Sequence, residues 1–350
     1  MNTTLTNDNF LNYALVHDFG DIHCHVDTST GMRAIIAIHN TNLGPALGGC
    51  RFIHYPTNYD ALYDAMRLAR GMSYKSALAQ LPLGGGKAVI IQPTTPFDRE
   101  AYFKKFGQWV QQLNGRYITA LDSGTQLSDM DIIATQTSYV ASLSCHQGDP
   151  SPHTAQGILR GIQAAVAFKL KKDSLKNLHI AIQGIGHVGY TLAKLLHEHG
   201  ARLSVADVDP MRVTQAVQEF NAQAVPIDKI HAIACDVFSP CALGAIINDK
   251  TLNEFKTTII AGAANNQLEH TYHGQKLYDK GILYATDYVI NAGGVIFAAS
   301  KYFNTDESIM HMQIDRIYDT LLDIFSQSTT KQQSTNIIAD SIAQARIIQR

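Results

Sequence analysis

Hydrophobic and polar positions follow clear periodicities in the first part of the chain. Over residues 59–80, apolar side chains recur at intervals of three and four, which predicts a helix with one buried face. Pro82 and three glycines end this helix, and an unbroken apolar run then predicts a buried strand at residues 88–91. A second amphipathic helix is expected after Asp98, and Gly115 suits its C-terminal end.

The pattern changes in the second half of the chain to an alternation of short apolar strands and amphipathic helices. Such an alternation is typical of a parallel sheet covered by helices. Two prolines and two glycines between Gln147 and Gly157 mark the change. We therefore predict an α/β protein of two domains with a cleft between them, residues 1–148 and a doubly wound Rossmann domain at residues 149–328. A C-terminal helix at residues 329–350 is expected to return to the first domain.

Composition narrows the class of protein. With 350 residues, 45% apolar and 17% charged, the chain can bury a large core. The formal net charge of −2 and the lack of basic blocks argue against nucleic acid or a membrane as the main partner. No apolar run reaches the ~18 residues of a membrane span, and the N-terminus lacks a signal-peptide pattern. Five cysteines without a Cys-x-x-Cys pair fit reduced thiols in the cytoplasm.

The segment "GIGHVG" follows a predicted strand with the Gly-x-Gly-x-x-Gly spacing of a dinucleotide-binding turn. Gly184 allows the tight turn, Gly186 lets a pyrophosphate approach the backbone, and Gly189 permits close helix packing. Asp207 ends the next strand, where its carboxylate can bind a ribose 2′-hydroxyl and would repel a 2′-phosphate. The sequence therefore favours an NAD site over an NADP site, and a Rossmann fold without a cofactor is the alternative. The other residues of the turn are Ile185, His187 and Val188.

The stretch "LPLGGGKAVII" also looks like a phosphate-binding loop, because its glycines end in Lys87. A Walker-type loop requires a glycine at the position of Leu81 and a hydroxyl side chain at the position of Ala88. It also requires a strand before the glycines and a helix after them, whereas the predicted order here is the reverse. We therefore do not expect Lys87 to hold a phosphate.

Several motifs occur together: "TNLGPALGGCRF", "GMSYKSALAQLPLGGGKAVII", "LNGRYITALDSGT", "MDIIATQTSYV", "GDPSPHTAQGILRG" and "DYVINAGGV". In this order and spacing they closely resemble the amino-acid dehydrogenases of the Glu/Leu/Phe/Val family, most of all its leucine dehydrogenase branch. The resemblance runs from about Thr28 to Phe325. It implies an N-terminal α/β domain for substrate binding and oligomerisation, and therefore a homo-oligomer. It also implies NAD-dependent, reversible oxidative deamination of an L-amino acid to its 2-oxo acid and ammonia.

The resemblance assigns roles to three charged residues. It implies that Lys75 pairs with the substrate α-carboxylate, that Lys87 activates the attacking water, and that Asp122 shuttles protons at the amine. Burial and a second cation, with Lys75 as the candidate, would lower the pKa of Lys87 toward neutrality. The glycines before Lys87 are expected to leave room for the substrate. The alternatives are a solvated Lys75 and an Asp122 that caps a helix.

Polar residues of the second domain complete the expected site. Thr154 resembles the family threonine near the nicotinamide amide, and "GAANNQ" follows a strand where a doubly wound sheet binds its ligand. Asn291 is a candidate contact for both substrate and nicotinamide. Ordinary turn chemistry is the alternative for these asparagines. The candidates in "GAANNQ" are Ala263 and Asn265 for the cofactor and Asn266 for the substrate.

The expected side-chain pocket is apolar. Glutamate-specific relatives carry a lysine and a serine where this chain has Leu47 and Ala298, and an unpaired charge would cost several kcal/mol to bury. We therefore expect an apolar, branched-chain substrate (leucine, valine or isoleucine). A phenylalanine- or tryptophan-preferring enzyme is the first alternative, and a non-catalytic NAD-binding regulator is the second. The predicted pocket residues are Leu47, Gly48, Ala120, Val295 and Ala298.

Two further features of the sequence bear on the expected site, Leu121 and a pair of histidines. Leu121 stands where the family commonly has a glutamate, which removes a charge beside Asp122. His23 and His25 share one face of a predicted strand, but a metal site requires three or four converging ligands. No metal is therefore expected.

Overall fold

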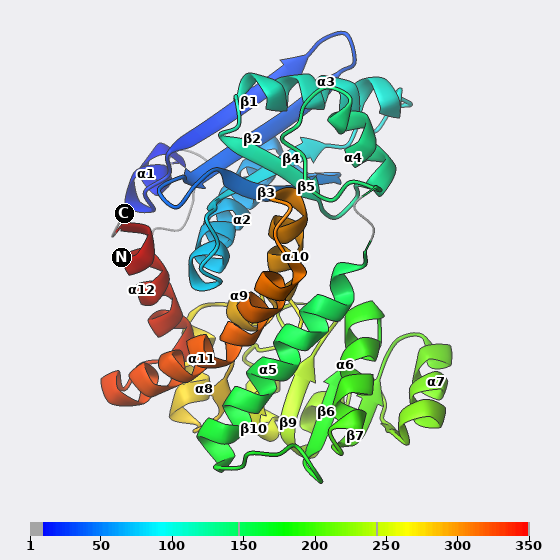
Figure 1. Cartoon of the computed structure of the whole chain (residues 1–350), viewed down its shortest axis with the longest axis vertical. Helices are drawn as coiled ribbons and strands as arrows, with labels where there is room; N and C mark the ends of the chain where they lie inside the picture. Colours follow the sequence, from blue (N-terminus) through cyan, green and yellow to red (C-terminus); the bar gives the residue numbers. More distant parts are fainter. Residues whose placement is uncertain (1–9, 146–147, 243, 349–350) are drawn as a thin grey trace. The chain divides into compact units, whose positions relative to one another are not determined.

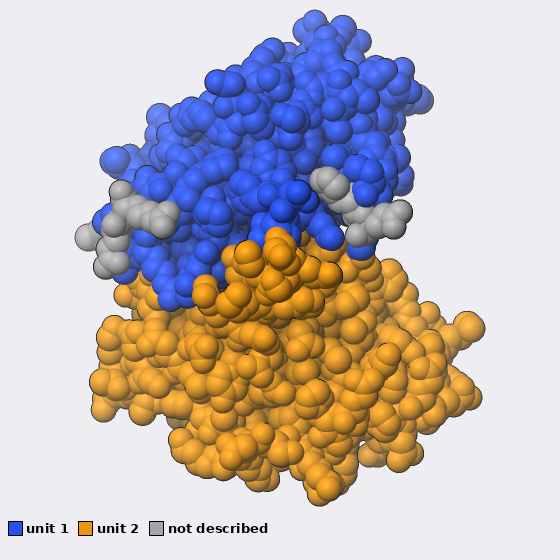
Figure 2. Space-filling view, in the orientation of Figure 1, with its two compact units in different colours: residues 1–148, 298–305, 343–350 blue, residues 149–297, 306–342 orange. Residues whose placement is uncertain are grey.

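The computed structural model describes residues 10–145, 148–242 and 244–348. The chain divides into two compact units (Figure 2). Unit 1 comprises Met1–Gly148, Ala298–Thr305 and Ala343–Arg350, and unit 2 comprises Asp149–Phe297 and Asp306–Ile342. Residues 146 and 147, at the start of the predicted boundary segment, lie outside the described residues.

Unit 1 contains a five-stranded mixed sheet. Its strands are β1 (Asp21–Asp27), β2 (Met32–Asn40), β3 (Ala46–Ile53), β4 (Gly84–Ile91) and β5 (Tyr117–Leu121). They lie in the order β1-β2-β4-β3-β5, with β3 parallel to both β4 and β5 and β2 antiparallel to both β1 and β4. Every residue of β4 is buried, as expected for a strand with both faces covered.

Different helices cover the two faces of this sheet (Figure 1). The helices are α1 (Phe10–Val16), α2 (Asn58–Leu78), α3 (Arg99–Gln112) and α4 (Leu127–Ala134). Met66 of α2 packs in one apolar cluster with Ile35 of β2, whereas Phe106 of α3 packs in the opposite cluster with Ile36. Successive residues of β2 therefore point to opposite helices, as the period of a strand requires.

The two helices predicted from periodicity are α2 and α3. Thr57 caps the first turn of α2, and its hydroxyl accepts a hydrogen bond from the Asp60 N–H at 3.1 Å. Asp98 caps α3 in the same way through the N–H of Ala101. Both helix starts are therefore fixed by local sequence, and packing against the sheet fixes the buried faces.

Unit 2 contains a six-stranded parallel sheet. Its strands are β6 (His179–Gln183), β7 (Arg202–Ala206), β8 (Gln223–Ala224), β9 (Ala234–Pro240), β10 (Lys256–Ile260) and β11 (Leu283–Tyr284). They lie in the order β11-β10-β9-β6-β7-β8, so the chain winds outward in both directions from β6 and β9. This confirms the predicted doubly wound Rossmann fold, whose ligands bind at the carboxyl ends of the strands next to the reversal.

Helices cover both faces of the second sheet (Figure 1). The helices of this part of the chain are α5 (Pro150–Leu170), α6 (His187–Glu198), α7 (Pro210–Phe220), α8 (Tyr272–Asp279), α9 (Asp287–Ile290), α10 (Gly293–Tyr302) and α11 (Glu307–Lys331), with 3-10 turns η1 (Ile230–Ala232) and η2 (Thr251–Asn253). Residues 298–302 of α10 belong to unit 1. One face packs Phe238 and Ile260 against η1, η2 and α8. The helices α5 and α6 lie together, next to α11. Within the described residues, no helix has both the length and the apolar character needed to cross a membrane.

The C-terminal region differs in detail from the predicted single helix at residues 329–350. Helix α11 continues to Lys331 and ends at Gln332, which has a φ of +53°. A separate helix, α12 (Thr335–Ile348), follows. The residues that group with unit 1 are 343–350, together with residues 298–305 of the α10 region.

Candidate active site

The three glycines before Lys87 lie in β4, where neighbouring backbone approaches closely. A Cβ atom at Gly85 would lie 2.0 Å from the Ser73 nitrogen of α2, and one at Gly84 would lie 2.0 Å from the Asn40 oxygen of β2. These contacts are closer than any side chain permits. At Gly84 and Gly85 the space that a side chain would need is therefore filled by the protein's own backbone, and at Gly86 it is filled by the Tyr117 ring. Room for a substrate beside these glycines stays a prediction.

Lys87 follows these glycines and is buried, with 6% of its surface exposed. Its Nζ forms an ion pair with Oδ2 of Asp122, the residue that follows β5. Burial lowers the pKa of Lys87 below its usual value, although the charge of Asp122 acts in the opposite direction. A lysine of lowered pKa provides more of the neutral amine, which is the form that can accept a proton.

Asp122 is ionised and held in place. Burial raises its pKa, but the charges of Lys87 and Arg51 outweigh burial and leave the pKa below its usual value. Its backbone N–H donates to the Thr125 hydroxyl at 2.9 Å, in a tight turn after β5. The following helix is capped at Gln126, so Asp122 is not a helix-capping residue.

Arg51 is a member of this cluster that the sequence analysis missed. Its Nε lies 3.4 Å from Oδ2 of Asp122, and its Nη1 lies 2.7 Å from Oδ2 of Asp64. Arg51 is also a cation that lowers the pKa of Lys87, a role that the sequence analysis gave to Lys75. The register of β3 against β5, which pairs Cys50 with Leu121, places Arg51 opposite Asp122.

Lys75 lies in the last turns of α2 and is half-buried. The helix is anchored there by Ser73, whose hydroxyl donates to Nδ1 of His39 at 2.8 Å, while Nε2 of His39 donates to the His17 carbonyl at 2.9 Å. Burial lowers the pKa of His39 to about 4, so the ring stays neutral. His39 was not predicted, because no motif distinguishes it from the other histidines.

The predicted pocket residues of unit 1 lie on β3, which is next to β4, and on β5, which is next to β3. Leu47 pairs with Gly85, and a Cβ at Gly48 would lie 1.7 Å from the Gly86 oxygen. Ala120 lies on β5 and is 9% exposed, two residues before Asp122. Leu47 and Gly48 therefore lie on the strand between the one that carries Lys87 and the one that leads to Asp122, and Ala120 lies on the latter.

The dinucleotide turn of unit 2 has the features that its glycines predict. Gly184 has a φ of +95°, which favours glycine, and a Cβ at Gly189 would lie 2.0 Å from the Gly184 oxygen. A Cβ at Gly186 would meet only the end of Arg212, at 3.7 Å. Gly186 is the N-cap residue of α6, and His187 is the first residue of the helix. The open side of the turn therefore lies at the helix N-terminus, which fits the pyrophosphate of a dinucleotide.

Asp207 follows β7 and faces the same turn. Its Oδ2 accepts the Ile185 N–H at 2.6 Å, and its Oδ1 accepts the Asp209 N–H at 2.9 Å. A carboxylate oxygen has a second lone pair, so both oxygens can still accept a ribose hydroxyl. These backbone contacts, absent from the sequence analysis, fix the orientation of the carboxylate. Val188 lies in the first turn of α6.

The side chain of Asn291 forms hydrogen bonds with the loop that follows β10. Its Nδ2 donates to the Ala263 carbonyl at 3.1 Å and to Oδ1 of Asn265 at 2.8 Å. Its own Oδ1 is buried without a hydrogen-bond partner, as expected for a group that awaits a ligand. Gln267, which was not singled out before, holds the loop by donating to the carbonyls of Gly262 and Ala264.

Two other candidates of unit 2, Asn266 in this loop and Thr154 on α5, form hydrogen bonds within the protein. Asn266 is exposed with a φ of +52°, and its carbonyl accepts the Ala245 N–H at 2.7 Å. Thr154 lies in the first turns of α5, where its hydroxyl donates to the Pro150 carbonyl at 3.0 Å. A Cβ at Gly294 would lie 2.9 Å from the Thr154 hydroxyl, so this hydroxyl faces the start of α10.

The remaining pocket candidates lie on α10 and are half-buried. Val295 and Ala298 are three residues apart and therefore share a face of the helix. Val295 belongs to unit 2 and Ala298 to unit 1.

The histidine pair of β1 does not form part of a metal cluster. Across the described part of the chain, no group of three or more His, Cys, Asp or Glu side chains is arranged to hold a metal. The His25 ring stacks on Trp109 with ring centroids 5.1 Å apart.

Two family models match most of the chain. Residues 19–139 match the Glu/Leu/Phe/Val dehydrogenase dimerisation domain, and residues 204–348 match glutamate/leucine/phenylalanine/valine dehydrogenase. The chain is 46% identical over 338 residues to the leucine dehydrogenase of Geobacillus stearothermophilus, covering 96% of this chain and 92% of that protein. It is 43% identical over 328 residues to the L-tryptophan dehydrogenase of Nostoc punctiforme, covering 93% and 92%.

Solved structures of amino-acid dehydrogenases also match the chain. The crystal structure of L-tryptophan dehydrogenase from Nostoc punctiforme matches with a TM-score of 0.88 at 40% identity, covering 96% of this chain and 98% of that chain. A hetero-hexameric glutamate dehydrogenase from Thermus thermophilus matches with a TM-score of 0.74 at 17% identity, which shows a shared fold alone.

Proposed function

We propose that this chain, which belongs to the glutamate/leucine/phenylalanine/valine dehydrogenase family and is an amino-acid dehydrogenase, acts on L-leucine and related branched-chain amino acids. The reaction is reversible oxidative deamination to the 2-oxo acid and ammonia. Five leucine dehydrogenases that are 44–46% identical to the chain support this substrate class. The observation that carries the chemistry is the buried Lys87–Asp122 pair with its lowered lysine pKa.

The proton chemistry follows from these two residues. When bound, the nicotinamide accepts a hydride from the substrate Cα, which leaves an iminium group on the substrate. Neutral Lys87 takes a proton from the water that attacks this carbon. Ionised Asp122 takes a proton from the substrate ammonium before the oxidation and returns it to the departing nitrogen. The carboxylate, ionised again, then accepts the hydroxyl proton as the carbinolamine collapses to the 2-oxo acid and ammonia. The surroundings therefore favour ionised Asp122, and they make the neutral form of Lys87 easier to reach than that of an ordinary lysine.

Substrate selection follows from the neighbouring residues. We assign Lys75 to the α-carboxylate, since a half-buried lysine on α2 provides the complementary charge. Leu47, Ala120, Val295 and Ala298 provide apolar surface and no partner for a charged side chain. Discrimination among apolar side chains is weaker, because one methylene contributes only ~1–3 kcal/mol.

The family uses a nicotinamide dinucleotide, and we propose NAD rather than NADP for this chain. The Asp207 carboxylate is fixed by two backbone N–H groups beside the glycine turn. At that place a carboxylate favours the two ribose hydroxyls and repels a 2′-phosphate. Asn291, with its buried, unpartnered Oδ1, is the residue that we assign to the amide of the nicotinamide or to the substrate amine.

We also propose a homo-oligomer in the cytoplasm. Residues 19–139 match a dimerisation domain, which supports assembly of unit 1 with other copies. All five cysteines are free, which supports a reducing compartment. Light scattering on the purified protein gives the subunit number, and a monomer at working concentration would contradict the assembly.

The activity is tested with purified protein, NAD and a panel of leucine, valine, isoleucine, phenylalanine and tryptophan. We expect the absorbance of the reduced cofactor to rise fastest with leucine and its branched-chain relatives, and to rise much less with NADP. A clear preference for phenylalanine or tryptophan would contradict the substrate class. Absence of reduction with every apolar amino acid would contradict the proposed activity.

A further inference from the structure

A row of alternating charges leads from Lys87 to the surface of unit 1. Asp122 contacts Arg51, Arg51 contacts Asp64 at 2.7 Å, and Asp64 contacts Arg67 at 2.9 Å. The side chains of Arg51 and Asp64 are only 21% and 15% exposed. Partly buried pairs are screened less by solvent than exposed pairs. The charge of Arg51 is therefore effective at Asp122.

Both ends of Arg51 are held by rigid elements. The β3 backbone lies directly against Asp122, because a Cβ at Gly49 would come within 2.7 Å of the Asp122 Cβ. At the other end, Asp64 of α2 also accepts the Tyr55 hydroxyl at 2.7 Å. Strand, helix and turn thus fix the guanidinium between two carboxylates.

The contact with Asp122 is electrostatic more than directional. Arg51 Nε is buried without a hydrogen-bond partner, and it lies 3.4 Å from Asp122 Oδ2, which Lys87 also contacts. Lys87 must lose its charge to act as a base, and at that moment Asp122 would be a buried anion without a lysine partner. A buried charge that loses its partner is costly. Arg51 keeps its charge at every working pH, so it can remain the partner of Asp122.

On this basis, and resting on the proposed function, we propose that Arg51 is a positioning residue. It holds the Asp122 carboxylate in place and favours its ionised form between proton transfers, while Lys87 alternates between its charged and neutral forms. Asp64 anchors the other side of Arg51 and balances its charge.

Other titratable groups near Lys87 do not replace Arg51. Cys50 on β3 is buried, and burial raises the pKa of its thiol to about 12, so the thiol stays neutral. Tyr117 on β5 has a pKa well above its usual value, again because of burial. Lys75 and Arg67 are cations of α2, the helix that also carries Asp64, and neither is among the groups that shift the pKa of Lys87 most. Asp122 and Arg51 are thus the charged groups that act on Lys87 from β5 and β3.

The test compares Arg51→Gln, Arg51→Lys and Asp64→Asn with Arg160→Gln as a matched control. Arg160, in unit 2, also has a buried Nε without a hydrogen-bond partner, 3.1 Å from an aspartate, Asp315. Two readouts are measured: the pH at which Lys87 becomes reactive toward acetic anhydride, by mass spectrometry, and the pH profile of kcat/KM with leucine and NAD. Thermal melting monitors folding.

We expect Arg51→Gln to move both the Lys87 midpoint and the kcat/KM profile to higher pH, because a cation that disfavours charged Lys87 is lost. Asp64→Asn should move both to lower pH, because an anion that balances Arg51 is lost. We expect kcat of Arg51→Gln to fall about tenfold or more, a part of the 10²–10⁴-fold that a general base contributes. Arg51→Lys should restore the pH midpoint but only part of kcat, since lysine lacks the fork that spans two carboxylates.

The proposal is overturned if Arg51→Gln only lowers the melting temperature, as Arg160→Gln does, and leaves both pH midpoints at their wild-type positions. Labelling needs no turnover, so it separates this outcome from failure of the proposed activity. A shifted Lys87 midpoint in an enzyme that oxidises no amino acid would contradict the function and leave the charge coupling standing.

Discussion

Lys87 in unit 1 and Lys276 in unit 2 each form an ion pair with an aspartate, and their surroundings differ. Burial dominates at Lys87 and lowers its pKa, even with Asp122 alongside. At Lys276 the hydrogen bond from Nζ to Asp249, at 2.6 Å, dominates and raises the pKa. The side chains of this second pair are 47% and 64% exposed. The same two residue types therefore give a lysine of lowered pKa in one place and a lysine of raised pKa in the other.

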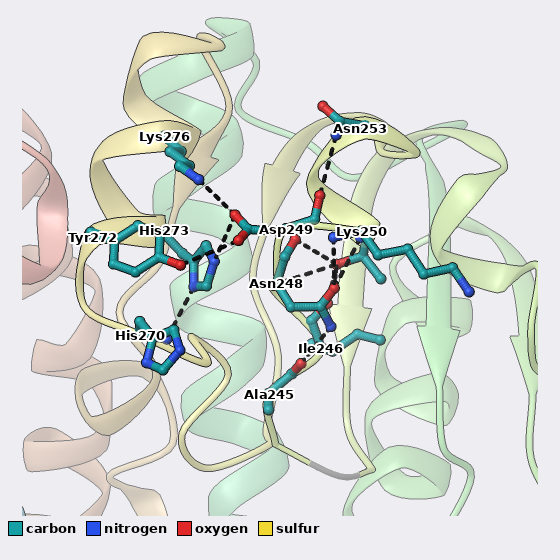
Figure 3. A network of polar contacts seen from close by, with 11 residues as sticks. Ala245, Ile246, Asn248, Asp249, Lys250, Asn253, His270, Tyr272, His273 and Lys276 are labelled. Carbon is teal, nitrogen blue, oxygen red and sulfur yellow. Dashed lines mark hydrogen bonds and ion pairs between the residues drawn. The ribbon is translucent and has the colours of Figure 1, made fainter.

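Asp249 belongs to a polar network that holds two segments of unit 2 together (Figure 3). Its carboxylate contacts Lys276, the Tyr272 hydroxyl and Nε2 of His273. Nδ1 of the buried His273 accepts the His270 N–H, so the ring hydrogen is on Nε2 and points to Asp249. The network joins the segment before η2 to the N-terminal turn of α8, and its charges remain in water.

An ion pair between a lysine and an aspartate is therefore not by itself evidence of an active site. Both pairs have short contacts and both include an aspartate of lowered pKa. What distinguishes Lys87 is the covered strand β4, which the close approach of α2 and β2 at the glycines makes possible. The chemistry of unit 1 therefore depends on packing as much as on charge.

The largest expected effect follows from removing the buried amine. Lys87→Ala should lower kcat by about 10²–10⁴-fold, the usual contribution of a general base. NAD binding should be retained, because the dinucleotide turn lies in the other unit, and calorimetry can measure it. Lys276→Ala is the matched control and should leave kcat unchanged. If Lys87→Ala abolished NAD binding, this lysine would have been misassigned.

The second prediction concerns the partner carboxylate. Asp122→Asn removes an anion that raises the pKa of Lys87, so the rise of kcat/KM with pH should occur at lower pH. kcat should fall as well, because the proton shuttle at the amine is lost. The pH profile of kcat/KM checks the sign. A profile displaced to higher pH would contradict the coupling between these residues.

A third prediction addresses the packing that buries Lys87. A methyl group at Gly85 would collide with the Ser73 nitrogen, and overpacking of this kind typically costs ~1–3 kcal/mol. Gly71, in the same helix as Ser73, has nothing within 4 Å of an added Cβ, so Gly71→Ala should stabilise by up to ~1 kcal/mol. Urea unfolding measures both variants. Equal stability of the two would contradict the close approach of α2 and β4.

The smallest effect is expected at the exposed pair. Asp249→Asn should lower the melting temperature slightly and leave kcat and KM unchanged, because exposed pairs contribute little and are screened by salt. Thermal melts at low and high salt, together with steady-state kinetics, check this. A loss of activity comparable to that of Lys87→Ala would remove the distinction between the two regions.

Much of the fold could be predicted from the sequence because its signals are local. Periodicity indicated α2 and α3, and the spacing of Gly184, Gly186 and Gly189 indicated the turn after β6. The start of the C-terminal helix at residue 329 was predicted a few residues too early, because the break lies at Gln332, which adopts a positive φ that glycine or asparagine usually marks.

The site was predictable only in part. Lys75, Lys87 and Asp122 followed from motifs, and their roles stay proposals. Arg51 was missed because its place beside Asp122 depends on the register of two parallel strands that are far apart in sequence. The close contacts of Gly84 and Gly85 could not be predicted from the sequence, because the backbone that approaches them belongs to β2 and α2.

The central claim is that burial gives Lys87 a lower pKa than an ordinary lysine. It is tested most directly by acetylating the wild-type protein over a range of pH and measuring Lys87 and Lys276 in the same samples by mass spectrometry. Burial slows the acetylation of a lysine at every pH, whereas the pH of half-maximal acetylation reports the deprotonation of its amine. We expect the Lys87 midpoint to lie below that of a free lysine and the Lys276 midpoint to lie above it. A Lys87 midpoint equal to or above that of Lys276 would contradict the claim.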